Sequence, residues 1–181
     1  MTTAGTLDIR MLPAAAAADA GLMAQLTDLV NGVYAVAEKG LWADGAARTR
    51  VEAITELARA GQIAVARLRG QIVGCIRIHL LGDGVGEFGM LAVIPTSRGT
   101  GVGRDLVLFA EQAAKRQRCH TMQLEVLVPR DWSHPSKDFL TDWYTRSGYK
   151  LARVGAIEES HPELAPLLAT PCDYVIYRKA L

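Results

Sequence analysis

Three glycines at alternate positions, Gly99, Gly101 and Gly103, join an apolar run to a stretch with helical periodicity. Glycine has no Cβ atom, so a ligand can approach the backbone of such a loop closely. A strand that enters a helix through this loop presents unpaired N–H groups and the positive end of the helix dipole, which together bind anions such as phosphate. Arg98 and Arg104 add full positive charges beside the loop. These residues therefore predict phosphate binding.

Neighbouring residues exclude two common phosphate-binding loops. A P-loop carries Lys and then Ser or Thr after its last glycine, whereas Arg104 and Asp105 follow Gly103. A dinucleotide-binding fingerprint needs a glycine three residues after Gly101, where Arg104 stands instead. The same glycine spacing recurs in a run that leads into a strand and that we interpret as a hairpin turn: Gly84, Gly86 and Gly89. A tight strand-to-helix turn without a ligand remains the alternative for the main loop.

The whole stretch V-I-P-T-S-R-G-T-G-V-G, residues 93–103, resembles the acyl-CoA-binding signature Q/R-x-x-G-x-G/A of the GNAT family of N-acetyltransferases. Arg98, Gly101 and Gly103 occupy its defining positions. The preceding G-E-F-G-M-L-A-V resembles the fourth strand of that family, and the later D-W-Y-T-R-S-G-Y-K resembles its late tyrosine motif. The resemblance covers roughly residues 5–181 in element order, with sharp motifs at 87–103 and 143–149.

The resemblance implies an α/β (α+β) fold with a mixed, mostly antiparallel sheet, helices on both faces, and a splayed fourth and fifth strand. Acetyl-CoA would be the cosubstrate and would lie in that wedge, with no metal required. The backbone of Leu91, Ala92 and Val93 would run along the pantetheine arm. The diphosphate would rest on the backbone of Arg98, Gly99, Thr100, Gly101, Val102, Gly103 and Arg104.

Two side chains match catalytic positions of the family. Glu87 stands where several members place a general base, often acting through water, and Tyr144 matches the tyrosine that stabilises the departing thiolate. Strict alternation places Glu87 on the face of Leu91 and Val93, although a bulge in this strand would shift that parity. A solvated strand-end carboxylate is the alternative for Glu87, and Glu125 is the second candidate for the base.

The segment before Tyr144 departs from the family pattern. Many members carry asparagine seven residues before the tyrosine, whereas this chain has Lys137, which would reach a phosphate or face solvent. Trp132 and His134 lie near the expected acceptor mouth, and the favoured interpretations are a packed tryptophan and a helix-capping histidine. His79 is interpreted as a partly exposed strand residue without a function.

The periodicity of the chain predicts the elements that must position these groups. One helix is expected after Pro13, and a second begins at a capping box formed by Thr49 and Glu52 and stops at Gly61. Two more helices are expected, one after Gly103 and one from Pro135 to Gly148. Strands are expected at 7–11, 63–68, 71–81, 87–94, 121–128, 149–157 and 172–181. Residues 1–181 thus form one domain with a mixed sheet.

Composition narrows the functional classes. The 181 residues are 50% hydrophobic and 22% charged, with a formal net charge of +1, so no basic footprint for nucleic acid is present and no membrane span is expected. Three widely spaced cysteines, Cys75, Cys119 and Cys172, favour neither a disulfide framework nor a zinc site and suit a reducing cytoplasm. A homodimer is compatible with the sequence.

The sequence therefore favours an N-acetyltransferase that acts on a primary amine of a small molecule, by direct attack on acetyl-CoA in a ternary complex. An acidic set borders the expected acceptor side and favours a cationic amine: Asp83, Glu87, Asp131, Asp138 and Asp142. One alternative is a non-catalytic acyl-CoA-binding or interaction module. Another is a structural domain whose glycine loop binds nothing.

Overall fold

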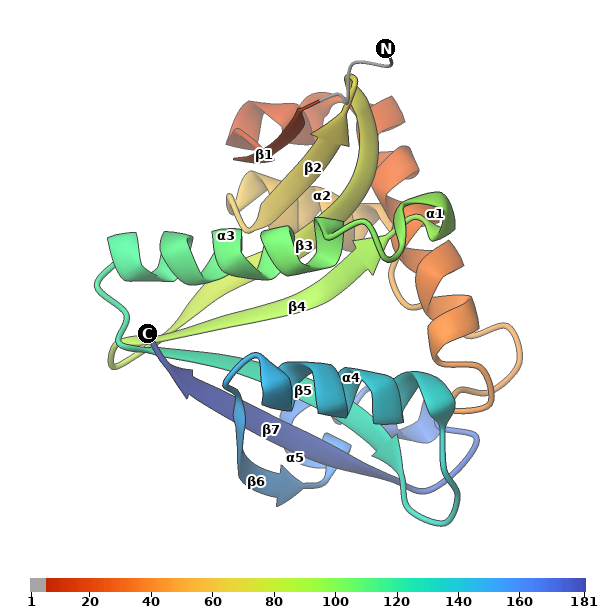
Figure 1. Cartoon of the computed structure of the whole chain (residues 1–181). Coiled ribbons are helices and arrows are strands. Elements are labelled where there is room, and N and C mark those ends of the chain that lie inside the picture. The colour runs from red at the N-terminus through yellow and green to blue at the C-terminus, as the bar shows by residue number, and fades with distance from the viewer. Residues whose placement is uncertain (1–5) are drawn as a thin grey trace.

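One seven-stranded mixed sheet runs through the computed structural model, which describes residues 6–181 (Figure 1). Residues 1–5, which the expected single domain includes, lie outside the described part of the chain. The strand order is β1-β2-β3-β4-β5-β7-β6, and every neighbouring pair is antiparallel except β4 and β5. The strands are β1 Leu7–Met11, β2 Ile63–Leu68, β3 Gln71–Gly82, β4 Val85–Val93, β5 Thr121–Pro129, β6 Lys150–Gly155 and β7 Cys172–Ala180.

Helices cover both faces of the sheet, as the resemblance implied (Figure 1). Helices α3 and α4 pack on one face, over a core that includes Phe88, Leu106 and Tyr149. Helices α1 and α2 pack on the other face, over a core that includes Met23 and Ile54. The α-helices are α1 Ala20–Ala37, α2 Val51–Arg59, α3 Val102–Arg116, α4 Pro135–Arg146 and α5 Ile157–Ser160, with short 3₁₀ helices at Ala14–Ala18, Pro95–Ser97 and Ala165–Leu167.

The central strands β4 and β5 separate soon after they meet. Their parallel pairing covers only Val85–Glu87 against Thr121–Gln123, although both strands continue for six further residues. Beyond Glu87, β4 is paired with β3 on one side only. The splayed pair predicted by the resemblance is therefore present, and it leaves one backbone edge of β4 without a neighbouring strand.

A bulge in β4 changes which side chains share a face. Met90 has φ +51°, and the β3–β4 register shifts between Arg77, paired with Gly89, and Cys75, paired with Ala92. Leu91 consequently joins the core on the α3 and α4 face, whereas Met90 and Ala92 pack against α1 and α2. The strict alternation that grouped Glu87 with Leu91 and Val93 is therefore wrong, because the extra residue reverses the faces.

Two predicted helix starts are also wrong. The alanine run after Pro13 forms a short 3₁₀ helix, and α1 begins at Ala20 because the Asp19 carboxylate accepts a hydrogen bond from the Leu22 amide at 3.0 Å. Helix α2 has no capping box. Its N-cap is Arg50, while the backbone of Thr49 exchanges two hydrogen bonds with the Asn31 side chain. A partner distant in sequence thus replaces the local cap.

The glycine run 84–89 is only partly a hairpin turn. Asp83 and Gly84 both have positive φ and form the turn between β3 and β4, but Gly86 and Gly89 lie inside β4. Gly86 is needed for packing, since a Cβ atom there would lie 2.9 Å from Cβ of Ala114 in α3. No such contact exists at Gly89.

Two further features of the described residues bear on the sequence predictions. No helix within residues 6–181 is long and apolar enough to cross a bilayer. Cys75, Cys119 and Cys172 are buried as free thiols.

The contrast between two strand glycines gives a stability prediction. Gly86→Ala should lower the free energy of unfolding by about 1–3 kcal/mol, because the new methyl group must displace backbone-anchored atoms of α3. Gly89→Ala is the matched control in the same strand and should change stability by less than about 0.5 kcal/mol. Urea unfolding measures both, and equal effects would contradict the packing assigned to α3 against β4.

Candidate active site

The glycine loop holds a run of backbone amides that the protein leaves free. The Arg98 amide donates to the Pro95 carbonyl at 3.2 Å, and the Asp105 amide donates to the Gly101 carbonyl at 3.0 Å. Between them, the amides of residues 99–104 have no hydrogen-bond partner among the described residues. Free amides at the N-terminus of a helix, here one of 15 residues, are suited to bind an anion.

Local geometry explains why this loop needs glycine. Gly99 and Gly101 have φ values of +76° and +95°, a backbone region that other residues rarely adopt. The Thr100 hydroxyl donates to the Ser97 carbonyl at 2.7 Å and fixes the turn. Gly103 has a negative φ, and a Cβ atom there would meet only distant side-chain atoms. Its value to the loop is therefore the open approach to its amide.

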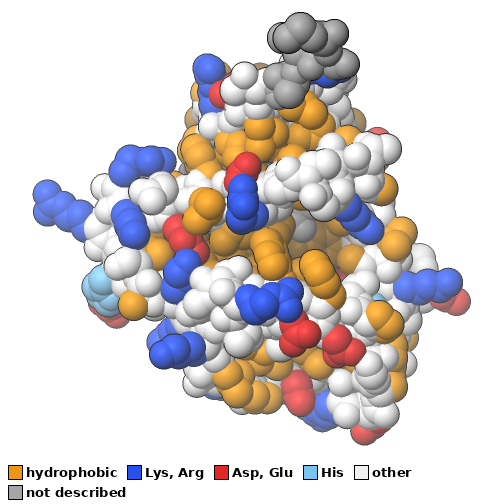
Figure 2. Space-filling model, viewed as in Figure 1, with side chains coloured by type: hydrophobic (Ala, Val, Ile, Leu, Met, Phe, Trp, Pro, Cys, Tyr) orange, Lys and Arg blue, Asp and Glu red, His pale blue; other side chains and the backbone are white. Residues whose placement is uncertain are grey.

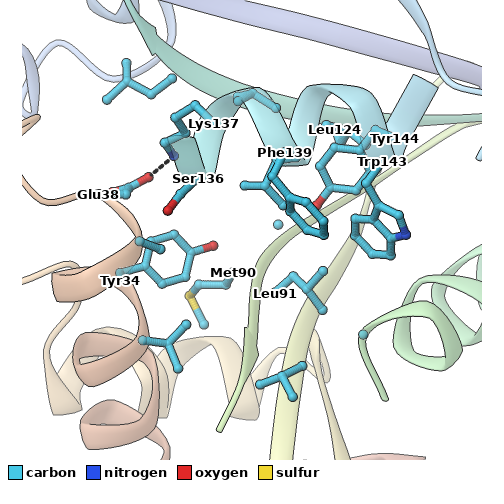
Figure 3. A pocket seen from close by; sticks show the side chains of 18 of the residues that line it. Tyr34, Glu38, Met90, Leu91, Leu124, Ser136, Lys137, Phe139, Trp143 and Tyr144 are labelled. Carbon is cyan, nitrogen blue, oxygen red and sulfur yellow. Dashed lines mark hydrogen bonds and ion pairs between the residues drawn. The ribbon is translucent and has the colours of Figure 1, made fainter. Parts of the chain in front are cut away.

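A cavity of about 740 Å³ extends from this loop between α3, α4 and α1. Figure 2 shows the hollow from the side of α3 and α4, with hydrophobic side chains inside and basic side chains around it. In Figure 3, α1 with Tyr34 borders one side of the cavity and α4 with Phe139 and Trp143 borders another. Several apolar residues from the splayed strands and α4 line it: Phe88, Leu91, Val93, Leu124, Val126 and Leu140.

Most residues predicted to bind the coenzyme meet at this cavity. Lining residues from that set are Leu91, Val93, Arg98, Gly99, Gly101, Gly103 and Arg104. The side chains of Ala92 and Val102 point elsewhere and are buried in the two cores, so only their backbone is available. Thr100 does not line the cavity either. The free edge of β4 at Leu91 and Val93 adjoins the same space.

Two carboxyl groups meet where β4 and β5 separate. Glu125 lies close enough to Glu87 to raise the pKa of that side chain, and only Glu125 lines the cavity. The Gln123 amide donates to Oε2 of Glu87 at 2.8 Å, and the Tyr174 hydroxyl donates to Oε2 of Glu125. Both predicted base candidates are therefore in one cluster, with Glu125 closer to the space that a substrate can enter.

Burial and, after it, the neighbouring Glu125 carboxylate together raise the pKa of Glu87 to about 7. His79 Nδ1 lies 3.7 Å from Glu87, but burial and the charge of Arg77 lower the pKa of His79. A neutral imidazole does not offset the repulsion between the carboxylates. Near neutral pH the Glu87 carboxyl group is therefore partly protonated.

Two tyrosine hydroxyls point into the cavity from different walls, Tyr144 from α4 and Tyr34 from α1 (Figure 3). Neither hydroxyl has a hydrogen-bond partner within residues 6–181, and burial raises the pKa of both phenols above the ordinary value. The Tyr144 ring is held by Phe88 and Tyr149, each with its centroid 5.9 Å away. Both groups are thus neutral donors available to a ligand.

Comparison with known proteins agrees with this geometry. The model of the acetyltransferase (GNAT) family matches residues 28–136. The chain belongs to that family. An aminoalkylphosphonate N-acetyltransferase of Salmonella typhimurium is 29% identical over 86 residues, which cover 45% of this chain and 51% of that relative. The chain thus spans about half the length of this curated relative.

Solved structures show the same fold at low identity. Rv2747 from Mycobacterium tuberculosis, solved with CoA, has a TM-score of 0.66 and 17% identity, with 96% of this chain and 99% of that chain covered. A GNAT family acetyltransferase from Elizabethkingia anophelis with acetyl-CoA bound has a TM-score of 0.56 and 16% identity over 72% and 82% of the two chains. The predicted family and fold are confirmed.

Lys137, at the position where many GNAT members have asparagine, faces neither solvent nor a phosphate site. Its ammonium group donates to Oε1 of Glu38 at 2.6 Å, and both side chains are almost fully buried (Figure 3). Trp42 donates to the other Glu38 oxygen at 2.6 Å. Burial alone would raise the pKa of Glu38, but Lys137 and Arg48 hold it below its ordinary value. The pair joins α1 to the start of α4 at the cavity wall.

Of the two interpretations near the acceptor mouth, the packed tryptophan is wrong and the helix-capping histidine holds only in part. Trp132 is 40% exposed rather than packed, with its indole N–H bonded to the Thr170 hydroxyl. His134 occupies the N-cap position of α4 but makes no capping hydrogen bond, and its Nε2 lies 3.1 Å from the Lys39 carbonyl. Neither residue lines the cavity.

Several acidic residues from the predicted acceptor border also lie away from the cavity: Asp83, Asp131, Asp138 and Asp142. Sequence reasoning missed Tyr34, Glu38, Arg48 and Tyr174, which do line it. Tyr34 follows Val33 on an apolar helical stripe and carries no motif. No group of three or more His, Cys, Asp or Glu side chains suited to a metal ion occurs within residues 6–181.

The buried ion pair gives the prediction for this site. Lys137→Met leaves the Glu38 carboxylate buried without its partner and should lower the free energy of unfolding by about 3–5 kcal/mol. The double variant Glu38→Gln/Lys137→Met should recover most of that loss, because no buried charge remains. Arg10→Met, which breaks an exposed ion pair with Asp8, should cost less than about 1 kcal/mol. If the double variant were as unstable as Lys137→Met, the loss of stability would not come from the unpaired Glu38 charge, which would contradict the role assigned to the ion pair.

Proposed function

We propose that the protein transfers an acetyl group from acetyl-CoA to the primary amine of a small molecule, by direct attack within a ternary complex. One observation carries the proposal. A single cavity connects a loop of free amides to a carboxyl pair and is lined by an unpartnered tyrosine hydroxyl. The likeness to an aminoalkylphosphonate N-acetyltransferase supports a small amine as the acceptor.

Coenzyme binding follows from the backbone. The diphosphate rests on the amides of residues 99–104, with the Arg98 guanidinium beside them. The pantetheine arm then lies in the split between β4 and β5 and bonds to the free β4 edge at Leu91–Val93, as an added strand would. Its thioester reaches the end of the split where the carboxyl pair stands.

Proton removal is the first chemical requirement. A primary amine with a pKa of about 10 is almost wholly protonated at neutral pH, so it must lose a proton before it attacks the thioester carbonyl. Glu125 faces the cavity and Glu87 stands behind it with a pKa near 7. We assign the pair as the general base, in which Glu125 receives the proton and Glu87 shares it.

Thiolate departure is the second requirement. Reference pKa values of about 10 for tyrosine and 8.5 for a thiol make full proton transfer uphill by about 2 kcal/mol. Burial raises the pKa of Tyr144 and makes that transfer still less favourable. Tyr144 therefore acts by donating a hydrogen bond to the departing sulfur in the transition state.

Calorimetry with acetyl-CoA and a thiol-release assay over a panel of amines test the proposal. Binding with release of CoA thiol in the presence of an amine is the expected result. Binding without release from any amine would instead indicate a non-catalytic acyl-CoA-binding module. A protein that binds no coenzyme would be a structural domain, and the proposal would fail.

The carboxyl pair predicts a pH profile. Its ionised form is the base, so kcat/KM should rise with pH through an inflection near 7. Glu87→Gln should shift that inflection to lower pH, because the repulsion between the carboxylates is lost, and Glu125→Gln should lower kcat/KM by about 10-fold or more. His161→Gln is the control, since its imidazole lies 3.8 Å from Glu125 and histidines titrate in this range. An inflection that disappears only in the histidine variant would exclude the pair.

The two cavity tyrosines predict unequal effects on turnover. Tyr144→Phe should lower kcat by about 10-fold or more with little change in the Kd of CoA, because its hydrogen bond forms only as the sulfur departs. Steady-state kinetics and calorimetry provide the two measurements. If Tyr34→Phe lowered kcat and Tyr144→Phe did not, Tyr34 of α1 would be the residue that stabilises the departing thiolate.

A further inference from the structure

Four basic residues line the cavity, and they divide into two kinds. Arg104 and Lys137 are each bound to a carboxylate. Arg98 and Arg48 form no ion pair within residues 6–181. Arg98 stands in the glycine loop, where the coenzyme diphosphate supplies its anion. Arg48 lies in the segment between α1 and α2, and nothing in acetyl-CoA binding as derived above uses it.

Arg48 lies at the edge of the cavity without an ion pair to any described residue, although its charge helps to lower the pKa of Glu38, whose carboxylate is bound by Lys137. Its guanidinium carbon lies 5.1 Å from the centre of the Tyr34 ring, so the aromatic face orients the cation while its N–H groups stay available. An adjoining pocket of about 430 Å³ between α1 and the 39–48 segment shares Arg48, Tyr34 and Trp42 with the main cavity. Arg48 thus lies where the two pockets meet.

Arg48, Tyr174 and Glu125 line the same cavity. The Tyr174 hydroxyl donates to Glu125, and burial together with that contact raises the pKa of Tyr174, while Arg48 opposes the rise. The cavity thus contains a carboxyl group suited to an ammonium and a guanidinium that forms no ion pair with the described residues and is suited to an anion. This arrangement has the charge pattern of a small zwitterion.

We propose that the acceptor is a primary amine that also carries an anionic group, a carboxylate or a phosphonate, and that Arg48 binds this group beside Tyr34. The inference rests on the proposed acetyl transfer for its amine end. It differs from the expectation of a purely cationic amine, because none of the five acidic residues behind that expectation lines the cavity. Guanidinium binds either oxyanion through paired N–H donors.

Four amines of similar length separate the possible acceptors: β-alanine, aminoethylphosphonate, propylamine and diaminopropane. The kcat/KM of at least one anionic amine should exceed that of propylamine by about 10-fold or more. Arg48→Gln should remove about 10-fold or more of that value and leave propylamine unchanged, and Arg48→Lys should restore part of it. Arg50→Gln is the control, because Arg50 is exposed, forms no ion pair within residues 6–181 and does not line the cavity.

A second readout does not depend on turnover. Calorimetry of each amine with the CoA-bound protein should show tighter binding of an anionic amine and its loss in Arg48→Gln. Such binding without acetyl transfer would retain the anion site and overturn the proposed activity. Acetyl transfer that favours propylamine or diaminopropane, or that falls equally for all four amines in Arg48→Gln, would retain the activity and overturn this inference. The carboxylate and phosphonate results identify the preferred anion.

Discussion

The structure depends on the point where β4 and β5 stop pairing. Only Val85–Glu87 and Thr121–Gln123 form the parallel ladder, and beyond it the strands diverge although the sheet continues on both sides. Unpaired backbone is costly inside a protein, so an open strand edge persists only where solvent or a ligand can satisfy it. The split thus supplies a binding edge, a cavity and a junction at which side chains from both strands meet.

Packing around the junction holds these groups in place. Phe88, Tyr144 and Tyr149 form an aromatic cluster on the α3 and α4 side, with centroid separations of 5.9 Å. On the opposite face, Gln123 connects Glu87 to Arg178, because its amide donates to the carboxylate and its oxygen accepts from the guanidinium at 2.9 Å. Aromatic packing on one face thus holds the tyrosine, and hydrogen bonding on the other face holds the Glu87 carboxyl group.

Local sequence was sufficient to predict the elements whose chemistry is local. The glycine loop, the helix that follows it and the left-handed Gly148 after α4 were all predicted, since each depends on residues within one turn. Features that depend on partners distant in sequence were not predicted. The Asn31 side chain bonds to the backbone of Thr49, which was expected to cap α2. Lys137 forms an ion pair with Glu38, which lies 99 residues away in the sequence. The Met90 bulge reversed the predicted faces because alternation assumes an unbroken ladder.

Binding of the coenzyme diphosphate by the free amides of residues 99–104 is the central proposal, because every later step of acetyl transfer requires bound acetyl-CoA. An amide nitrogen–proton correlation spectrum recorded during titration with CoA tests them directly. The account predicts that the resonances of Gly99 to Arg104 shift most strongly on saturation, and that pantetheine, which lacks the diphosphate, leaves them nearly unchanged. CoA binding that shifts other amides and leaves this loop unchanged would contradict the account.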